Sequence, residues 1–309
     1  MVFVYRRFRG LCYYTFVVTN RHVIERNLDR QLWIRFRPPP LDQSGRVFQG
    51  SSTDQDIAAF LRAPTLEQDA TPFPVPTGDF PADPWIFHPD PSIDLAVMGL
   101  ESVQMPSELK PNRYLTLDRY SVTREELRSS ECDEGNEVFI LGFPLGIAGT
   151  SQNDVIVRHG IIARIRDWYD GRSKNFLIDS SIYPGNSGGP VVLKPVITSI
   201  KQRPMINQAR LLGLVTGYLP YQDVAISLQT GTPRLVSEED SGLAPVIPID
   251  TVVELISTIA ELFNNTPGNY VTFEAMRAAV DVLVSNPSAG KSQSREANTE
   301  PGNSIETSS

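Results

Sequence analysis

The stretch NFLIDSSIYPGNSGGPVVL, residues 175–193, holds two short apolar runs on either side of a glycine-rich segment. Glycine adopts backbone conformations closed to other residues, so the glycines of YPGNSGGP permit a tight turn. Such a turn exposes the hydroxyl of Ser187 together with neighbouring backbone N–H groups. The stretch predicts two strands joined by a turn that carries a candidate nucleophile. A glycine-rich hairpin that merely contains a serine is the alternative.

Short apolar runs of the same kind recur along the chain and favour an all-β barrel or sandwich. The opening residues 2–20 predict a hairpin that turns at Arg9 and Gly10. Helical spacing is expected at residues 54–62 and at 249–263, behind Asp250, and a short capped helix is expected within 121–127. Residues 64–91 are dense in proline and acidic side chains, which predicts an irregular loop rather than a further strand. The other expected strands lie at residues 32–36, 94–100, 137–143, 154–165 and 211–218.

Composition excludes several classes of protein. A chain of 309 residues suits two domains, and a net charge of −8 argues against a nucleic-acid partner. Two cysteines, Cys12 and Cys132, allow at most one bridge, so neither a disulfide-stapled scaffold nor a cysteine-rich zinc module is expected. Arginines at positions 6, 7 and 9 interrupt the apolar start, and no run of about 18 apolar residues follows. We expect no membrane span and a cytoplasmic location, with export open if the natural start lies upstream.

A serine hydroxyl becomes a strong nucleophile only when a neighbouring base takes its proton. The chain offers three histidines, and position favours His22, at the end of an apolar strand, over His88 in the proline-rich loop and His159 within a strand. Asp94 lies in the apolar run SIDLAVM, where burial is costly unless a donor such as a histidine accompanies it. Each residue alone also fits a structural role in packing or in capping a turn.

Three motifs appear in the order His, Asp, Ser: VTNRHV (18–23), DLAVM (94–98) and GNSGGPVV (185–192). Together they resemble the trypsin-like serine peptidases of the chymotrypsin fold, particularly the bacterial type without disulfides. The resemblance covers residues 1–264 and implies an all-β fold of two packed six-stranded β-barrels with a C-terminal helix. The implied parts are an N-terminal barrel (1–100), an inter-domain crossing (101–130), a C-terminal barrel (131–248), a helical segment (249–285) and a disordered tail (286–309).

The resemblance also implies catalytic roles. Ser187 attacks the substrate carbonyl, His22 takes and returns the proton, and Asp94 holds the imidazole tautomer. The backbone N–H groups of Gly185 and Ser187 form the oxyanion hole. No cofactor is implied, and the three scattered histidines show no pair at metal-ligand spacing, so no metal is expected.

The substrate pocket implied by the resemblance has Ser181 at its floor and Thr216, Gly217 and Tyr218 along its wall, with Thr216 as the small hydroxyl beside the catalytic aspartate. Because Ser181 is not acidic, we expect a small or apolar residue before the cleaved bond. Asp179 shares a strand face with Ser181, and a pocket role and a surface role are both open for it.

The expected function is that of a soluble serine endopeptidase that binds a polypeptide in extended form. Two alternatives remain from the sequence: a catalytically silent peptide-binding module on the same fold, and a non-peptide acyl hydrolase such as an esterase. The oligomeric state, the regulation and the physiological substrate stay open.

Overall fold

The structure is a computed structural model. It describes residues 2–8, 12–27, 32–36, 71–75, 85–99, 115–130, 132–148, 154–195, 209–265, 278 and 280. The helix expected at 54–62 and the tail expected after residue 286 lie outside these residues. The domain boundaries given above remain predictions.

The N-terminal half is built on a five-stranded sheet in the order β5-β6-β2-β1-β7. The expected hairpin is present: β1 (Val2–Phe8) pairs antiparallel with β2 (Cys12–Thr19). Strand β6 (Ala96–Gly99) pairs with the other edge of β2, and β5 (Ile86–Phe87) pairs with β6. β7 (Leu115–Thr116) runs parallel to β1, so the crossing segment contributes a strand to the first sheet.

A second, two-stranded sheet corrects the sequence prediction. β3 (Leu32–Phe36) was expected, but β4 (Thr71–Val75) pairs antiparallel with it inside the segment predicted to be irregular. That prediction was wrong for 71–75 and also for β5. The physical reason is the spacing of the prolines in TPFPV. Pro72 and Pro74 are two residues apart, so the missing N–H groups fall on one edge of the strand and the other edge remains able to pair.

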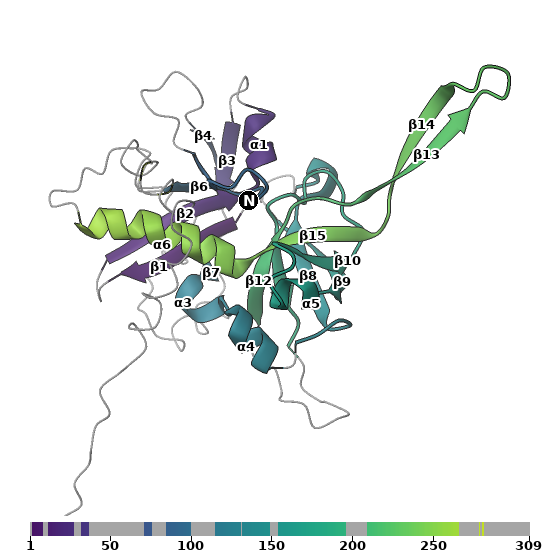
Figure 1. The fold of residues 1–309 in the computed structure, drawn as a ribbon. Helices are drawn as coiled ribbons and strands as arrows, with labels where there is room; N and C mark the ends of the chain where they lie inside the picture. Colours follow the sequence, from purple (N-terminus) through teal and green to yellow (C-terminus); the bar gives the residue numbers. More distant parts are fainter. Residues whose placement is uncertain are drawn as a thin grey trace, which may run out of the picture.

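The C-terminal half is a closed barrel of six strands, β8 (Glu137–Gly142), β9 (Ile156–Arg164), β10 (Phe176–Asp179), β11 (Pro190–Leu193), β12 (Arg210–Val215) and β15 (Leu243–Pro248). Alternate residues of β8 are buried, as a strand with one face on a core requires. Branched aliphatic side chains such as Val138, Ile140 and Ile162 fill the interior around Trp168 and Phe176. Figure 1 shows this barrel beside the N-terminal sheet, and the all-β, chymotrypsin-like expectation is confirmed.

Two short helices, α3 (Leu117–Tyr120) and α4 (Arg124–Ser129), follow β7, and α5 (Arg166–Tyr169) follows β9. The capping box expected in SVTREEL is present. Glu126 N donates to Thr123 Oγ1 at 3.2 Å, while Thr123 N donates to Glu126 Oε2 at 2.9 Å. Arg124 N donates to Asp250 Oδ2 at 2.9 Å, which ties α4 to the C-terminal helix.

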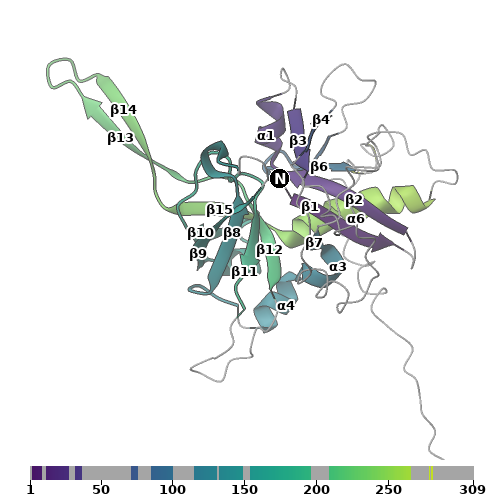
Figure 2. The same cartoon turned by 180° about the vertical axis from the view of Figure 1, so that it is seen from behind.

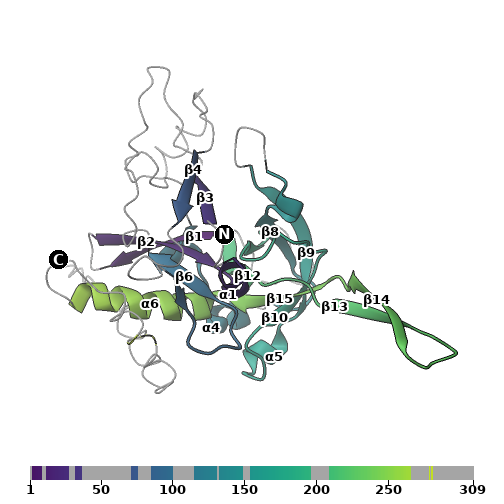
Figure 3. The same cartoon turned by 90° about the horizontal axis from the view of Figure 1, so that it is seen from above.

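The C-terminal helix α6 (Ile249–Asn265) confirms the helix expected behind Asp250. It runs along the N-terminal sheet although the chain has just left the barrel, as Figures 2 and 3 show. Its apolar face joins one core that draws on both halves, made by Val252, Leu255, Ile256 and Ile259 with Phe16, Leu95, Val97, Leu214 and Ile247. Burial of an aliphatic side chain stabilises by roughly 1.5–3 kcal/mol, so the helix helps to hold the two halves together.

Between β12 and β15 the chain leaves the barrel as a two-stranded ribbon of β13 (Pro220–Ile226) and β14 (Pro233–Asp240). Figure 1 shows it extending away from the rest of the molecule. The sequence did not predict this ribbon, because its strands carry no sustained apolar run. Among the described residues, no helix is long and apolar enough to cross a membrane.

Candidate active site

His22 and Asp94 are brought together by the pairing of β2 with β6, in which Thr19 lies opposite Ala96. His22 lies in the one-turn helix α1 (Arg21–Glu25), which begins two residues after the end of β2, and Asp94 lies two residues before the start of β6. Their side chains meet at 2.6 Å between His22 Nδ1 and Asp94 Oδ2. The backbone N–H of His22 also donates to Asp94 Oδ1 at 2.9 Å. The carboxylate therefore contacts both the backbone and the imidazole ring of His22.

This contact fixes the tautomer of His22. A carboxylate only accepts hydrogen bonds, so the hydrogen of the neutral ring lies on Nδ1 and Nε2 is left as an acceptor. Both side chains are partly accessible, at 28% for His22 and 30% for Asp94. The pair therefore lies within reach of solvent and not in a sealed core.

The loop that leads into Asp94 is held from the His22 side. Asn20, which is fully buried, donates from Nδ2 to the Asp94 carbonyl oxygen at 3.0 Å. The Arg21 side chain donates from Nη2 to the His88 carbonyl oxygen at 2.6 Å. His88 itself is buried, and burial lowers its pKa; its Nδ1 accepts from Asp90 N at 3.1 Å. His88 thus has a structural role in this loop, whereas His22 is the histidine that contacts Asp94 and Ser187.

Ser187 lies in the loop between β10 and β11, and two glycines of that loop make close approaches. Gly188 has φ of +76°, and a Cβ there would come within 2.6 Å of Thr19 Oγ1 at the end of β2. Gly185 has φ of +98°, and a Cβ there would come within 2.1 Å of the Phe143 carbonyl oxygen. Glycine is therefore required at both positions, once to bring the loop against the N-terminal half and once to pack it on its own barrel.

The Ser187 hydroxyl has two acceptors within reach. Its Oγ is 3.2 Å from His22 Nε2 and 3.0 Å from the Thr216 carbonyl oxygen. A hydroxyl has one hydrogen to donate, so it serves one of the two acceptors at a time. The three predicted residues thus form a continuous chain of side-chain contacts, from Asp94 through His22 to Ser187.

The backbone around Ser187 leaves two donors free among the described residues. The N–H groups of Asn186, Gly188 and Gly189 donate to carbonyl oxygens of Tyr183, Val215 and Asn186. Within the same described part of the chain, the N–H groups of Gly185 and Ser187 donate to none. These are the two groups that the sequence predicted as oxyanion donors.

The residues of the predicted pocket wall follow β12. The Thr216 hydroxyl donates to the Pro245 carbonyl oxygen at 3.2 Å, and the Thr216 carbonyl oxygen accepts from Ser187 Oγ at 3.0 Å. Gly217 faces open space, since a Cβ there would meet nothing within 4 Å. The Tyr218 hydroxyl donates to Glu238 Oε1 at 3.2 Å, and this contact is the main cause of its raised pKa.

Ser181 is exposed in the segment between β10 and the Ser187 loop, and Asp179 is exposed at the end of β10.

Sequence reasoning missed Asp240, which lies at the end of the ribbon. Its carboxylate accepts from Ile182 N at 3.1 Å and from Gly242 N at 2.9 Å, which joins the base of the ribbon to the predicted pocket floor. The sequence gives only a weak signal for Asp240, because it stands in the acidic run SEED.

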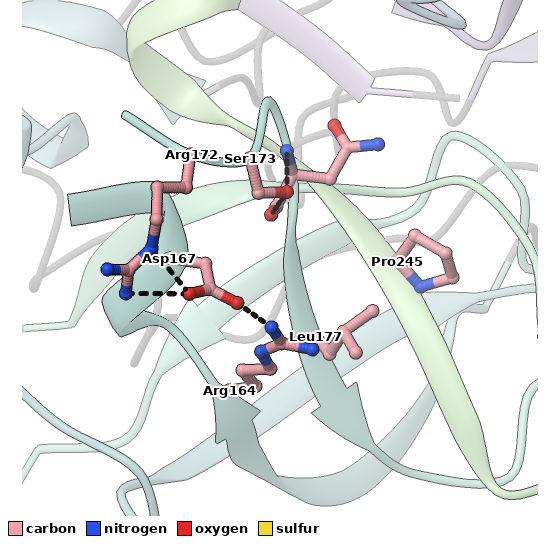
Figure 4. Close-up of a pocket in the computed structure, with 7 residues that line it drawn as sticks. Arg164, Asp167, Arg172, Ser173, Leu177 and Pro245 are labelled. Atoms are coloured by element: carbon pink, nitrogen blue, oxygen red, sulfur yellow. Dashed lines mark hydrogen bonds and ion pairs between the residues drawn. The ribbon is translucent and has the colours of Figure 1, made fainter. Parts of the chain in front are cut away.

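A separate pocket lies on the C-terminal barrel and contains none of the triad residues (Figure 4). Asp167 binds both Arg164 and Arg172, and Arg172 also pairs with Asp170 at 2.9 Å. The guanidinium charges there are therefore already matched by carboxylates. The pocket is lined by Arg164, Asp167, Arg172, Ser173, Asn175, Leu177 and Pro245.

The remaining reactive side chains do not form a second centre among the described residues. His159 Nε2 contacts the exposed Glu137 carboxylate at 2.8 Å. Cys132 is buried, and burial raises the pKa of its thiol to about 12, so it is not a thiolate near neutral pH. In this part of the chain no group of three or more histidine, cysteine or acidic side chains is arranged to hold a metal ion.

Comparison with known families agrees with this geometry. The model of the trypsin-like peptidase domain matches residues 3–194, which is more than half of the chain and includes His22, Asp94 and Ser187. The comparison with curated proteins gave no match. On the matched domain and the fold described above, the chain belongs to the trypsin-like peptidase family.

Proposed function

We propose that the chain is a serine endopeptidase that hydrolyses peptide bonds through an acyl-enzyme, with Ser187, His22 and Asp94 as its catalytic triad. The trypsin-like peptidase domain supports peptidase activity in general. One observation carries the proposal. The contacts run without a gap from Asp94 Oδ2 to His22 Nδ1 at 2.6 Å, and from His22 Nε2 to Ser187 Oγ at 3.2 Å.

Acylation begins when the Ser187 hydroxyl turns from the Thr216 carbonyl oxygen to His22 Nε2. Oγ attacks the substrate carbonyl carbon while its proton passes to Nε2, and Asp94 stabilises the imidazolium that forms. His22 then gives this proton to the leaving amine as the C–N bond breaks. A water molecule repeats the sequence on the ester, with His22 again as base, and frees Ser187.

The free N–H groups of Gly185 and Ser187 support the same proposal, since the attacked carbonyl oxygen gains negative charge in the tetrahedral intermediate. Preorganised donors stabilise this charge, and loss of one donor typically costs about 2.7–4 kcal/mol of transition-state stabilisation. The loop conformation at Gly185 depends on glycine, because φ of +98° is open to glycine and strained for other residues.

We further propose a polypeptide substrate that binds in extended form beside residues 216–218, with a small or apolar side chain before the cleaved bond. Ser181 offers no charge to a basic side chain. The carboxylate of Asp240 is held at the loop by the N–H groups of Ile182 and Gly242.

Labelling with a fluorophosphonate probe tests the proposed chemistry. The purified chain should take up the probe at one site, mass spectrometry should locate the adduct on Ser187, and both Ser187→Ala and His22→Ala should abolish it. Ser181→Ala is the matched control, since Ser181 is exposed and makes no hydrogen bond to a histidine of the described residues, and this variant should label like the wild type. Absence of labelling in a chain with native circular dichroism would contradict the proposal and favour the peptide-binding module.

Cleavage assays separate the peptidase from the esterase. Unfolded protein and internally quenched peptides should be cut within the chain, and peptides with alanine or valine before the bond should exceed those with arginine. Turnover of small esters with no cleavage of any peptide in the library would overturn the peptidase assignment while leaving the triad intact.

A further inference from the structure

The ribbon β13–β14 lies beyond residue 194, outside the segment matched by the family model. Nearly every side chain on it is exposed, including large apolar ones such as Val224 at 47%, Leu235 at 64% and Val236 at 55%. A two-stranded hairpin alone in water is marginally stable at best. From the register of the ribbon and its charges, we propose that the outer edge of β14 pairs antiparallel with β14 of a second copy, which makes a four-stranded sheet and a homodimer.

The outer edge of β14 is available for such pairing. β14 pairs with β13 along one edge, and no strand of the described residues lies along the other. Ser241, directly after β14, donates its N–H inward to the Leu219 carbonyl oxygen at 3.2 Å. Backbone groups alternate in direction along a strand, so the N–H and C=O groups of Glu238 and Val236 point outward. Within β14 there is no lysine, its one proline, Pro233, stands at the start, and the shift in its pairing with β13 falls at the same end, beside Arg234, so the edge from Leu235 to Asp240 is regular.

Symmetry restricts the register. Two identical antiparallel strands related by a two-fold axis must have one residue facing its own copy. With Val236 at that centre, Arg234 lies opposite Glu238 of the second copy, and the converse pair forms on the other side of the axis. Opposite charges placed across neighbouring strands stabilise a sheet. A centre one residue later, at Ser237, would place Val236 opposite Glu238, and a centre at Leu235 would place Arg234 opposite Val236.

The same register aligns the apolar side chains. Val224 of β13 faces Val236 of β14, so these two share one face of the ribbon. In the dimer they meet the same two residues of the second copy, which gives a row of valines across four strands, flanked on each side by an Arg234–Glu238 pair. The row removes apolar surface from water, which is the main favourable term in most protein association.

The other edge of the ribbon does not offer this match. The middle residue of β13 is Asp223, and β13 contains no basic residue, so two copies centred there would set two carboxylates face to face. Charge complementarity therefore favours the β14 edge and a second copy of this chain as its occupant.

Cross-linking tests the register directly. In a Val236→Cys variant the two new thiols face each other, and the Cα separation of a hydrogen-bonded antiparallel pair, about 5.5 Å, suits a disulfide. Mild oxidation should give a dimer that reductant reverses. Glu239→Cys is the matched control, because residue 239 faces Pro233 of the second copy in this register. Cross-linking at 239 in place of 236 would overturn the register.

Sedimentation velocity over a dilution series tests whether the Arg234–Glu238 pairs stabilise the dimer. Wild type should be a dimer, and Arg234→Glu or Glu238→Arg should each raise Kd about tenfold or more, because each replaces two attractions by two repulsions. The double variant should restore the dimer, and Glu239→Arg should leave it intact. Circular dichroism checks that each variant is folded. A wild type that stays monomeric at high micromolar concentration, or a double variant no tighter than the singles, would overturn the proposal. A monomer whose peptide cleavage fails in Arg234→Glu would also overturn it and assign the edge to substrate.

Discussion

Lys174 of the C-terminal barrel forms an ion pair with Asp90 of the N-terminal half. Asp90 precedes Asp94 by four residues in the sequence. Lys174 lies in the turn before β10 of the barrel, and its Nζ also reaches Ser92 Oγ at 2.6 Å. Asp90 and Ser92 belong to the loop that ends at Asp94. The barrel that carries Ser187 therefore holds the loop that positions the carboxylate partner of His22.

Replacement of Lys174 by methionine should lower kcat by about three- to tenfold and leave KM nearly unchanged, since small displacements of a catalytic group reduce rate more than binding. Lys174→Arg should recover most of the rate, because the guanidinium reaches the same carboxylate. Steady-state kinetics on an internally quenched peptide measures both constants. Equal loss in the arginine and methionine variants would show that the ion pair does not position the loop.

The stability given by this ion pair should disappear in acid. The hydrogen bond from Lys174 is the largest cause that lowers the pKa of Asp90 below its ordinary value of about 3.8. A lowered carboxyl pKa contributes stability above the unfolded-state pKa, and this contribution is lost as pH falls further. Exposed pairs are worth about 0.2–1 kcal/mol. Urea unfolding should show wild type above Lys174→Met at pH 7 by that amount, with the curves converging below about pH 4.

Asp94→Asn should lower kcat by about 10⁴-fold while the fold persists. The asparagine amide presents a donor where His22 Nδ1 needs an acceptor, so the ring is pushed into the tautomer with its hydrogen on Nε2, which then cannot accept from Ser187. Thermal unfolding checks the fold, and fluorophosphonate labelling should slow in parallel with peptide cleavage. A loss of less than tenfold would mean that Asp94 does not set the tautomer.

The three residues of the proposed triad could be chosen from sequence because each carries its own local signal. Ser187 stands among glycines, His22 ends a strand, and Asp94 interrupts an apolar run. The antiparallel pairing of β2 with β6 then brings His22 and Asp94 together, because the end of β2 lies beside the start of β6. Likewise, the closed barrel and α6 follow from short apolar runs and helical spacing, which report burial directly.

Lys174 and the β13–β14 ribbon could not be predicted in this way. The contact between Lys174 and Asp90 joins residues 84 positions apart, and nothing near either residue marks the other. The ribbon is held together by the hydrogen bonds between its two strands and not by burial of side chains. Its sequence therefore lacks the alternation of apolar residues that identifies a core strand. Sequence reasoning missed β4 because its two prolines, which lack an N–H donor, argued against a strand. Both missing N–H groups lie on the same edge of β4, so the other edge can still pair.

Gly188→Ala should destabilise the fold by about 1–3 kcal/mol and reduce activity at least tenfold, because the new Cβ meets Thr19 Oγ1 at 2.6 Å and φ of +76° is strained for alanine. Adding Thr19→Ala removes that oxygen and should recover part of the loss, with the backbone strain remaining. Gly217→Ala is the matched control, since its Cβ meets nothing within 4 Å and stability should hold. Equal destabilisation at 188 and 217 would contradict this account of the glycine turn.

Asp250→Asn should make the chain less sensitive to pH. Burial raises the pKa of Asp250 to about 6, against the opposing hydrogen bond from Arg124 N, because the ionised carboxylate loses hydration at the start of α6. A raised carboxyl pKa contributes stability that is complete below the unfolded-state value near pH 4 and is lost as pH rises through about 6. Asparagine still accepts from Arg124 N and carries no charge to desolvate. Urea unfolding at pH 4.5 and pH 8 should therefore show a fall in wild-type stability, by at most about 3 kcal/mol, that the variant lacks. If the wild type and Asp250→Asn fell by the same amount over this range, the change would have to come from another group. The partly buried carboxylate between α4 and α6 would then not limit stability at neutral pH.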